Sequence, residues 1–322
     1  MSTKRIFSSV TALARVRSGV LSFVLVVGVL AAVSLLVVTY TRPAHATFPG
    51  VPGKIAYESN SDGPYSQIYT IWPGGGGKHQ VTHSSVGAAD PAYSPDGARI
   101  AYYRDDGEED EIYTIKVDGG DERQVTNFTG GANNPAYSPD GARIAYNGKG
   151  DGDWEIYTAR AGGGGGTLQL THNTKSDWMP SYSPNGNRIA YVSYDDDGND
   201  WEIYTIKVGG GDKRQVTHNT RIDFHPDYAP NGNRIAYESY DGNDTEIYTI
   251  RVDGSDRKKV TNNSRPDEDP SYSPNGRRMA YVSLQPLGVS DIYTIKTDGE
   301  DRRQVTHSTT PVYARAPSWG SR

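Results

Sequence analysis

The chain has 322 residues, no cysteine and a formal net charge of −6. Without cysteine, neither a disulfide framework nor a lipid anchor on cysteine is possible. The acidic balance disfavours nucleic acid and anionic membrane surfaces as partners, because those surfaces are bound by clustered Lys and Arg.

Residues 1–46 have the pattern of an export leader. Basic side chains occur in residues 1–17 without any acid, residues 19–40 are apolar apart from Ser22, Ser34 and Thr39, and an Ala-x-Ala sequence ends at Ala46. These three features are typical of a cleaved signal peptide. An uncleaved anchor is the alternative, because about 20 apolar residues can span a bilayer. In both cases we expect the rest of the chain outside the cytoplasm, either secreted or periplasmic, or held at the membrane by this segment. Cleavage would leave a net charge of −11, since residues 1–46 carry five basic and no acidic side chains.

After a short linker at 47–52, the tripeptide Ile-Tyr-Thr recurs six times at intervals of 44 to 47 residues. A period of about 40–45 residues with several strand-like pieces is the signature of a β-propeller. Each period also holds an Ile-Ala-Tyr strand (Met-Ala-Tyr in the last), a Val-Thr or similar strand, and a Tyr-Ser-Pro-Asp/Asn-Gly turn or its Tyr-Ala-Pro-Asn-Gly variant. The copies of Ile-Tyr-Thr begin at Ile68, Ile112, Ile156, Ile203, Ile247 and Ile292.

These strands predict an all-β, six-bladed β-propeller of four-stranded antiparallel blades over residues 53–322. The first repeat begins at Lys54 with no Tyr-Ser-Pro strand before it. The C-terminal sequence Ala-Pro-Ser-Trp-Gly, residues 316–320, aligns with the inner strands of the other repeats. We therefore expect the C-terminal strand to join the N-terminal blade and close the ring, in a single domain that is a monomer.

The repeat resembles that of TolB-type WD40-like propellers. The resemblance rests on Pro-Ala-Tyr-Ser-Pro-Asp-Gly-Ala-Arg-Ile-Ala-Tyr, residues 91–102, followed by Glu-Ile-Tyr-Thr-Ile-Lys-Val-Asp-Gly-Gly, residues 111–120, and by Arg-Gln-Val-Thr-Asn, residues 123–127. It covers roughly residues 53–320 and implies a protein partner more than a small metabolite. TolB itself carries an N-terminal domain before its propeller, which this chain does not show.

Several recurring polar residues are attributed to the fold. Histidines follow the fourth strand in four repeats, too far apart around a ring to share one metal ion with bonds of about 2.1 Å. Asp177, Asp223 and Asp267 recur in phase and are expected to cap loop amides. The acidic loops between second and third strands are expected to be solvated turns, with a weak divalent-cation site at Asp195–Asp200 as the alternative. No cofactor and no metal site are predicted.

Positions at which single repeats differ from the others are the candidates for function. Trp154 and Trp201 precede the Glu of Glu-Ile-Tyr, where other repeats have Ser, Asp or Thr. Trp178 and Phe224 stand two residues before the proline of the inner strand. Exposed aromatic side chains are favoured at contact sites. These residues therefore indicate either a recognition surface at one end of the ring or loops that pack on one another.

Two further irregular residues belong to the fifth repeat. His225 precedes the inner-strand proline, and Asp227 follows it where other repeats have Ala or Ser. Asp227 is the one unusual acid that the sequence places on an inner strand. Because neither a catalytic nucleophile with its general base nor a phosphate-binding loop is recognisable, the sequence predicts a non-catalytic propeller that binds a protein, a peptide or a glycan. A polysaccharide-acting enzyme is the alternative.

Sequencing the N-terminus of the exported protein tests the leader prediction. Cleavage gives Thr47 as the first residue, whereas an intact leader shows that residues 19–40 remain as an anchor.

Overall fold

The computed structural model describes residues 50–105, 109–150, 152–194, 200–309 and 312–321. The predicted leader, residues 1–46, and most of Asp195–Asp200 lie outside the described residues. Within the described part of the chain, no helix is both long enough and apolar enough to cross a membrane.

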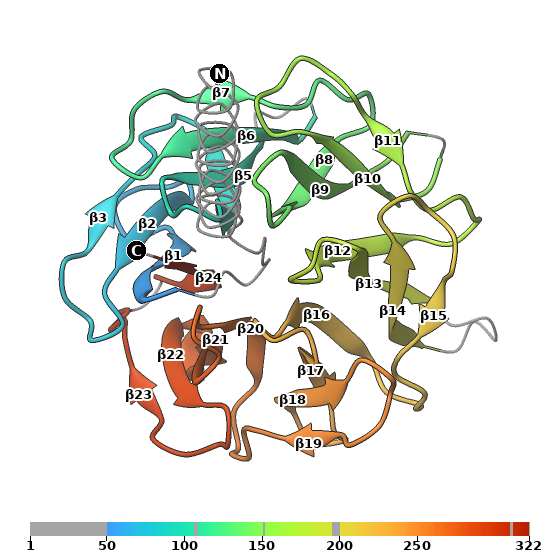
Figure 1. Cartoon of the computed structure of the whole chain (residues 1–322). Helices are drawn as coiled ribbons and strands as arrows, with labels where there is room; N and C mark the ends of the chain where they lie inside the picture. The colour runs from blue at the N-terminus through green and yellow to red at the C-terminus, as the bar shows by residue number, and fades with distance from the viewer. Residues whose placement is uncertain (1–49, 106–108, 151, 195–199, 310–311, 322) are drawn as a thin grey trace, which may run out of the picture. The chain divides into compact units, whose positions relative to one another are not determined.

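Six four-stranded antiparallel sheets are arranged as blades around a central axis (Figure 1). This confirms the predicted six-bladed propeller. The strands of each blade are given from the innermost to the outermost. Blade 1 consists of β24 (Ala314–Ser321), β1 (Pro52–Ser59), β2 (Gln67–Ile71) and β3 (His79–Gln80); blade 2 of β4 (Gly87–Tyr93), β5 (Arg99–Asp105), β6 (Glu111–Lys116) and β7 (Arg123–Gln124); and blade 3 of β8 (Ala132–Tyr137), β9 (Arg143–Gly148), β10 (Glu155–Arg160) and β11 (Leu168–Gln169). Blade 4 consists of β12 (Asp177–Tyr182), β13 (Arg188–Tyr194), β14 (Trp201–Lys207) and β15 (Arg214–Gln215); blade 5 of β16 (Asp223–Tyr228), β17 (Arg234–Tyr240), β18 (Thr245–Arg251) and β19 (Lys258–Lys259); and blade 6 of β20 (Asp267–Tyr272), β21 (Arg278–Leu284), β22 (Ser290–Lys296) and β23 (Arg303–Gln304). A 3-10 turn, η1 (Pro286–Gly288), lies between β21 and β22.

The blades bury both faces, which explains why their strands are almost continuously apolar. In β17 the run Ile235-Ala236-Tyr237 is fully buried at 0% exposure, and in β18 Ile247 is equally buried. The neighbouring blade on either side removes these side chains from water, which stabilises the fold by about 25 cal/mol per Å² of apolar surface buried. In every blade the tyrosines of the second and third strands form a ring pair, for example Tyr237 and Tyr248 with centroids 6.0 Å apart.

A threonine side chain fixes the outer strand of each blade. In blade 4, the Ile203 N–H donates to Thr217 Oγ1 at 2.9 Å, and the equivalent bond is present in all six blades. Each such bond satisfies a buried amide and contributes about 1 kcal/mol. The Val-Thr and Leu-Thr phrases of the repeat are therefore explained by the fold.

The C-terminal strand closes the ring, as the sequence predicts. In blade 1, β24 pairs with β1, with Trp319 opposite Ile55 and Ser318 opposite Ala56. Trp319 is only 5% exposed, and its Nε1–H donates to the Gly53 carbonyl at 3.3 Å. The first and last segments of the propeller thus share one sheet (Figure 1).

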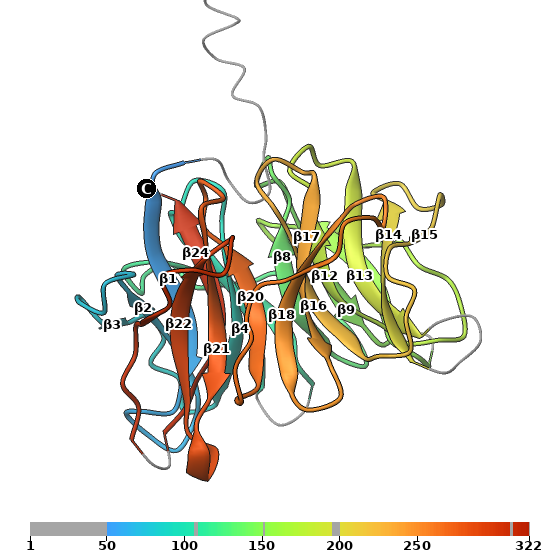
Figure 2. The same ribbon diagram turned by 90° about the horizontal axis from the view of Figure 1, so that it is seen from below.

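The two ends of the ring differ in what they carry. Ser321 Oγ donates to the Pro95 carbonyl at 2.9 Å, so the end of β24 lies beside the turn that joins β4 to β5. The start of β1 lies there as well, because Pro52 pairs with Ser321. The loops that lead into the inner strands are at the opposite end, which we call the loop end. Figure 2 shows the ring from the side, with the C-terminal end of β24 at the top.

We predict that Trp319→Ala lowers the free energy of unfolding by about 3–5 kcal/mol, because it leaves a cavity in the sheet that closes the ring. Removal of residues 312–322 leaves β1 without its inner neighbour and lowers the melting temperature further. Thermal and urea unfolding followed by circular dichroism measure both effects.

Trp72 offers a matched control, since it is 37% exposed and lies at the outer edge of blade 1. Trp72→Ala is expected to change stability by less than about 1 kcal/mol. An unchanged melt after the C-terminal deletion would contradict the closure.

Candidate functional site

A cavity of about 180 Å³ opens on the ring axis and is lined by consecutive residues of all six inner strands. A second cavity of about 90 Å³ lies next to it and shares the wall formed by the residues that follow the inner-strand prolines. We call the two together the channel. The shared residues are small in five blades and acidic in one: Ala92, Ala136, Ser181, Asp227, Ser271 and Ser318.

The residue before each inner-strand proline has a left-handed backbone conformation, with φ between 48° and 57°. Each of these residues sits at an irregularity in the pairing of its inner strand, which is where a bulge exposes side chains to a ring axis. Asp, Asn and His tolerate this conformation better than most residues. The six residues line the wider cavity, and we call them the mouth ring: Asp90, Asn134, Met179, His225, Asp269 and Ala316.

His225 joins two acids in the mouth ring. Its Nδ1 lies 3.0 Å from Glu238 Oε2, and its Nε2 lies 3.0 Å from Asp269 Oδ1. Glu238 also accepts the Asp269 N–H at 2.8 Å, so the three residues tie blade 5 to blade 6. Burial alone would lower the pKa of His225, but the carboxylates of Asp269 and Glu238 raise the pKa well above its usual value. His225 is therefore a charged imidazolium at neutral pH.

A second acidic pair lies between blades 1 and 2. The Asp90 N–H donates to Glu58 Oε2 at 3.3 Å, and Asn134 Nδ2 donates to Asp90 Oδ2 at 2.6 Å. Burial and the nearby Asp269 raise the pKa of Asp90 to about 6. Burial and the charge of Asp90 raise the pKa of Glu58 to about 8. Protons therefore remain on this pair close to neutral pH.

Asp227 lies deeper, in the wall between the two cavities. Its Oδ2 accepts the Tyr272 N–H at 2.7 Å, the bond that a serine hydroxyl makes in three other blades. Burial raises the pKa of Asp227 to about 7. A serine hydroxyl is enough to accept this bond, so the larger and ionisable carboxyl group of Asp227 is not needed for it.

The four predicted aromatic residues form two ring contacts at the loop end. Trp154 and Trp178 have centroids 4.5 Å apart, and Trp201 and Phe224 have centroids 5.6 Å apart. Phe224 continues to His225 at 6.4 Å. All four are partly exposed, and we call them the aromatic belt. The belt extends over blades 3 to 5 and reaches the mouth ring at His225.

Sequence reasoning missed part of this site. The expectation that Asp227 is the one unusual inner-strand acid is wrong, since Asp90 and Asp269 also line the channel. Glu58 and Glu238 reach the mouth ring from second strands of neighbouring blades. The signal was present in the position before each proline, which differs in every repeat except for the two Asp.

The expectation for the recurring acids is corrected in detail. In blade 4 the loop amide of Asn219 donates to Glu202 Oε1 at 2.6 Å, so the glutamate of the third strand caps the loop. Asp223 instead accepts the Asn219 side chain at 2.8 Å. The same arrangement joins Glu155 to Asp177 through Asn173 and Glu246 to Asp267 through Asn263. These acids belong to the fold.

Among the residues that the structure describes, two groups have the spacing to hold a cation: His225, Glu238 and Asp269, and Asp241, Asp244 and Glu246. In the second group, Lys259 Nζ lies 2.8 Å from Asp241 and 3.2 Å from Glu246. The lysine ammonium already supplies positive charge there. The histidines after the fourth strands, His83, His172, His218 and His307, are exposed on separate blades.

The fold and the channel define a six-bladed β-propeller whose axial cavity opens beside an aromatic surface. Residues 52–322 match the family model described as the TolB beta propeller domain. The chain belongs to this family. No curated protein sequence matches the chain.

Solved structures with the same fold include TolB from Acinetobacter baumannii, which is 23% identical with a TM-score of 0.72, covering 84% of this chain and 67% of that one. The putative TolB from Agrobacterium tumefaciens is 23% identical with a TM-score of 0.66, covering 79% of this chain and 88% of that one. A chain of the nidogen/laminin complex is 10% identical with a TM-score of 0.68, covering 83% of this chain and 98% of that one. At these identities the likeness concerns the fold.

The buried acids predict how stability depends on pH. Burial raises the pKa of Glu155 to about 7, of Glu202 to about 8 and of Asp267 to about 6. The folded state therefore binds more protons than the unfolded chain between the ordinary carboxyl pKa and these values. The contribution of these three groups to stability is largest in acid and falls as the pH rises from about 5 to about 8, by up to about 1.4 kcal/mol per pH unit for each proton.

Urea unfolding across this range measures the slope. Glu202→Gln is expected to flatten it, because Gln67 holds the same position in blade 1 and keeps the acceptor for the loop amide. Glu300→Gln, at a side chain that is 74% exposed, is the matched control. A slope unchanged by Glu202→Gln would contradict this assignment.

Proposed function

We propose that the chain is a non-catalytic, extracytoplasmic propeller that binds a peptide segment of a protein partner at its loop end. The observation that carries the proposal is the aromatic belt, whose four side chains remain partly exposed beside an open channel. His225 and Asp227 continue this surface into the channel.

The physical chemistry of the belt supports recognition. Trp and Tyr dominate the energy of protein interfaces because they remove a large apolar area from water at a small cost in side-chain entropy. The belt rests on a rigid base, since Trp178, Trp201 and Phe224 pack on the buried core between blades 4 and 5. A preorganised surface of this kind loses little freedom on binding. Packing of the loops and recognition are therefore compatible roles of the same residues.

The family supports the same conclusion at a coarser level. A TolB-like propeller is a scaffold for binding proteins in general. One structural relative was solved as a nidogen/laminin complex, which is an assembly of proteins. The leader pattern of residues 1–46 and the likeness to TolB suggest a location outside the cytoplasm.

An enzyme acting on polysaccharide is the second candidate. It is favoured by acids in the channel whose pKa lies near neutrality, since such a group can act as a general acid. Burial raises the pKa of Asp227 to about 7. Release of reducing sugar from a polysaccharide panel by the purified chain, lost in Asp227→Ser, would establish this candidate in place of the first.

Selection of short random peptides on the purified full chain tests the binding proposal. We expect enriched peptides whose affinity falls at least about tenfold in Trp178→Ala and Phe224→Ala, because truncation of a central aromatic residue costs about 2 kcal/mol or more. Binding is measured by calorimetry and by tryptophan fluorescence.

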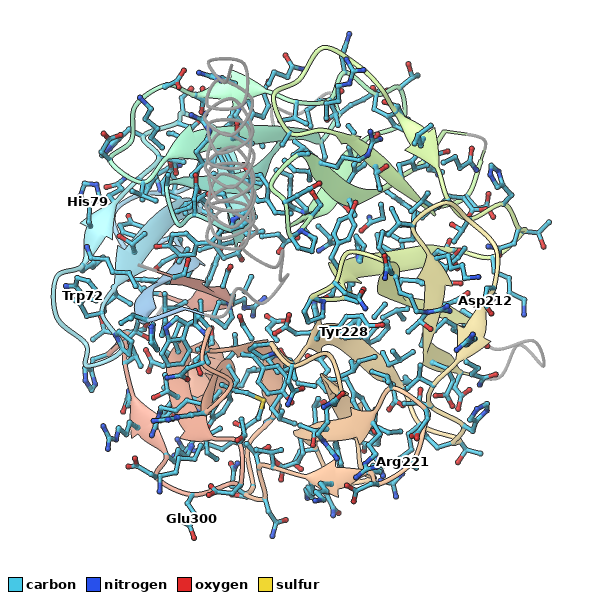
Figure 3. All side chains as sticks on the ribbon, in the orientation of Figure 1. Trp72, His79, Asp212, Arg221, Tyr228 and Glu300 are labelled. Atoms are coloured by element: carbon cyan, nitrogen blue, oxygen red, sulfur yellow. The ribbon has the colours of Figure 1, made fainter. Side chains whose placement is uncertain are left out.

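Trp72→Ala is the matched control, because Trp72 has similar chemistry but lies at the outer edge of blade 1 (Figure 3). Its peptide affinity is expected to be unchanged. Equal binding by the Trp72, Trp178 and Phe224 variants, with all three folded, would exclude the belt as the site.

A further inference from the structure

Carboxyl groups outnumber cationic side chains around the channel mouth, among the residues that the structure describes. The cationic side chains there are His225 and Arg315, both of which act on these acids electrostatically. The carboxyl groups are Glu58, Asp90, Asp227, Glu238, Glu268 and Asp269.

The two cations leave Asp90 without a close positive partner. His225 lies between Glu238 and Asp269, with both contacts at 3.0 Å. The Arg315 guanidinium lies over the Tyr313 ring, 5.2 Å from its centroid. The side chain that hydrogen-bonds to Asp90 is the amide of Asn134. Burial and the charge of Asp269 raise the pKa of Asp90, while the more distant charge of His225 and the bond from Asn134 lower it.

The mouth ring is also open next to this acid. Ala316 of blade 1 lies between Asp269 of blade 6 and Asp90 of blade 2, and its side chain is a single methyl group. From this gap the wider cavity continues to the narrower one, and Asp227 lies in the wall that they share. The other residues of that shared wall are Ala or Ser, and the inner-strand prolines line the wider cavity.

We propose that the channel mouth binds a lysine or arginine side chain of the protein partner. Its charged head lies between Asp90 and Asp269 and points towards Asp227, and its apolar stem lies against the prolines of the channel wall. The residues beside it in the partner then contact the aromatic belt. This inference rests on the proposed function and adds the chemistry of the residue that enters the channel.

A long basic side chain matches this space better than a bare ion does. Lys and Arg bury an apolar stem while the charge stays with polar groups, and the channel offers an apolar wall with acids spaced along it. A calcium ion instead draws its oxygen ligands to about 2.3–2.6 Å. Asp90 and Asp269 lie on blades separated by blade 1, and Asp269 is already bound to His225.

Two variants replace channel acids by the residue found at the equivalent position of another blade. Asp90→Asn reproduces the residue of blade 3, where Asn134 has a φ of 52°, close to the 49° of Asp90. Asp227→Ser reproduces the serine of blades 1, 4 and 6, which accepts the same amide bond. Glu300→Gln, at the outer edge of blade 6, removes an acid far from the channel (Figure 3).

The probes are the short peptides selected on the full chain, resynthesised with each Lys or Arg replaced by Gln. We expect the selected peptides to share a basic residue next to an apolar one. Replacing that basic residue, or introducing Asp90→Asn, lowers the affinity at least about tenfold, which corresponds to about 1.4 kcal/mol. When the Gln peptide binds the Asp90→Asn chain, its affinity is little lower than after either change alone, because the two changes remove the same interaction. Glu300→Gln leaves the affinity unchanged.

Three results separate the possible failures. If no peptide is enriched that depends on the belt, the proposed function fails and this inference fails with it. If belt-dependent peptides bind without a basic residue, or bind the Asp90→Asn and Asp227→Ser chains unchanged, this inference is overturned and the proposed function stands. If calcium chloride alone binds in calorimetry, depends on Asp90, and leaves the basic residue without effect, the mouth is an inorganic cation site and the inference is wrong.

Discussion

The convergence of six inner strands on one axis is the constraint on which the rest of the structure depends. The sheets can bury both faces only if the ring closes, and closure brings six strands within reach of one another. The residues after the prolines line both cavities of the channel, and five of the six are Ala or Ser. Asp227 breaks this rule. A larger, half-buried and ionisable group at this position costs free energy that an amide acceptor alone does not require, because serine provides the same bond in three other blades.

The periodic part of the sequence predicted the fold almost completely, since each phrase maps to one strand or turn of a blade. The closure by the C-terminal strand followed from a single aligned segment that ends in Trp319. The site was predicted in part. The aromatic residues were visible because Trp and Phe are conspicuous where other repeats have small or polar residues. Asp90 and Asp269 were overlooked because the bulge places three consecutive residues on the channel wall, whereas regular strand alternation would place only every second one there.

Contacts between blades explain the other parts of the site that the sequence did not predict. Glu58 and Glu238 lie on second strands, and their partners Asp90 and Asp269 lie 32 and 31 residues further along the chain, in the next blade. A repeat alignment compares equivalent positions, but it does not reveal which non-equivalent positions meet across a blade boundary. The same limit explains the recurring acids: Asp223 was correctly attributed to the fold, yet its partners, Asn219 and through it Glu202, come from the preceding blade and the connecting loop.

The geometry of the mouth ring makes the belt and the channel one asymmetric surface. Phe224 and His225 are adjacent in the chain, so a ligand that contacts the aromatic ring of one is beside the charged imidazolium of the other. Two residues before the proline, blades 4 and 5 present Trp178 and Phe224, whereas blades 6 and 1 present Glu268 and Arg315. A peptide that inserts one side chain into the channel therefore meets apolar surface on one side of the ring and charged surface on the other. Because the propeller is nearly sixfold in its backbone, only this difference in side chains can select one of six rotational placements for a partner. The orientation of the partner is thus decided by the residues that break the repeat, while the repeat itself supplies the rigid ring that holds them.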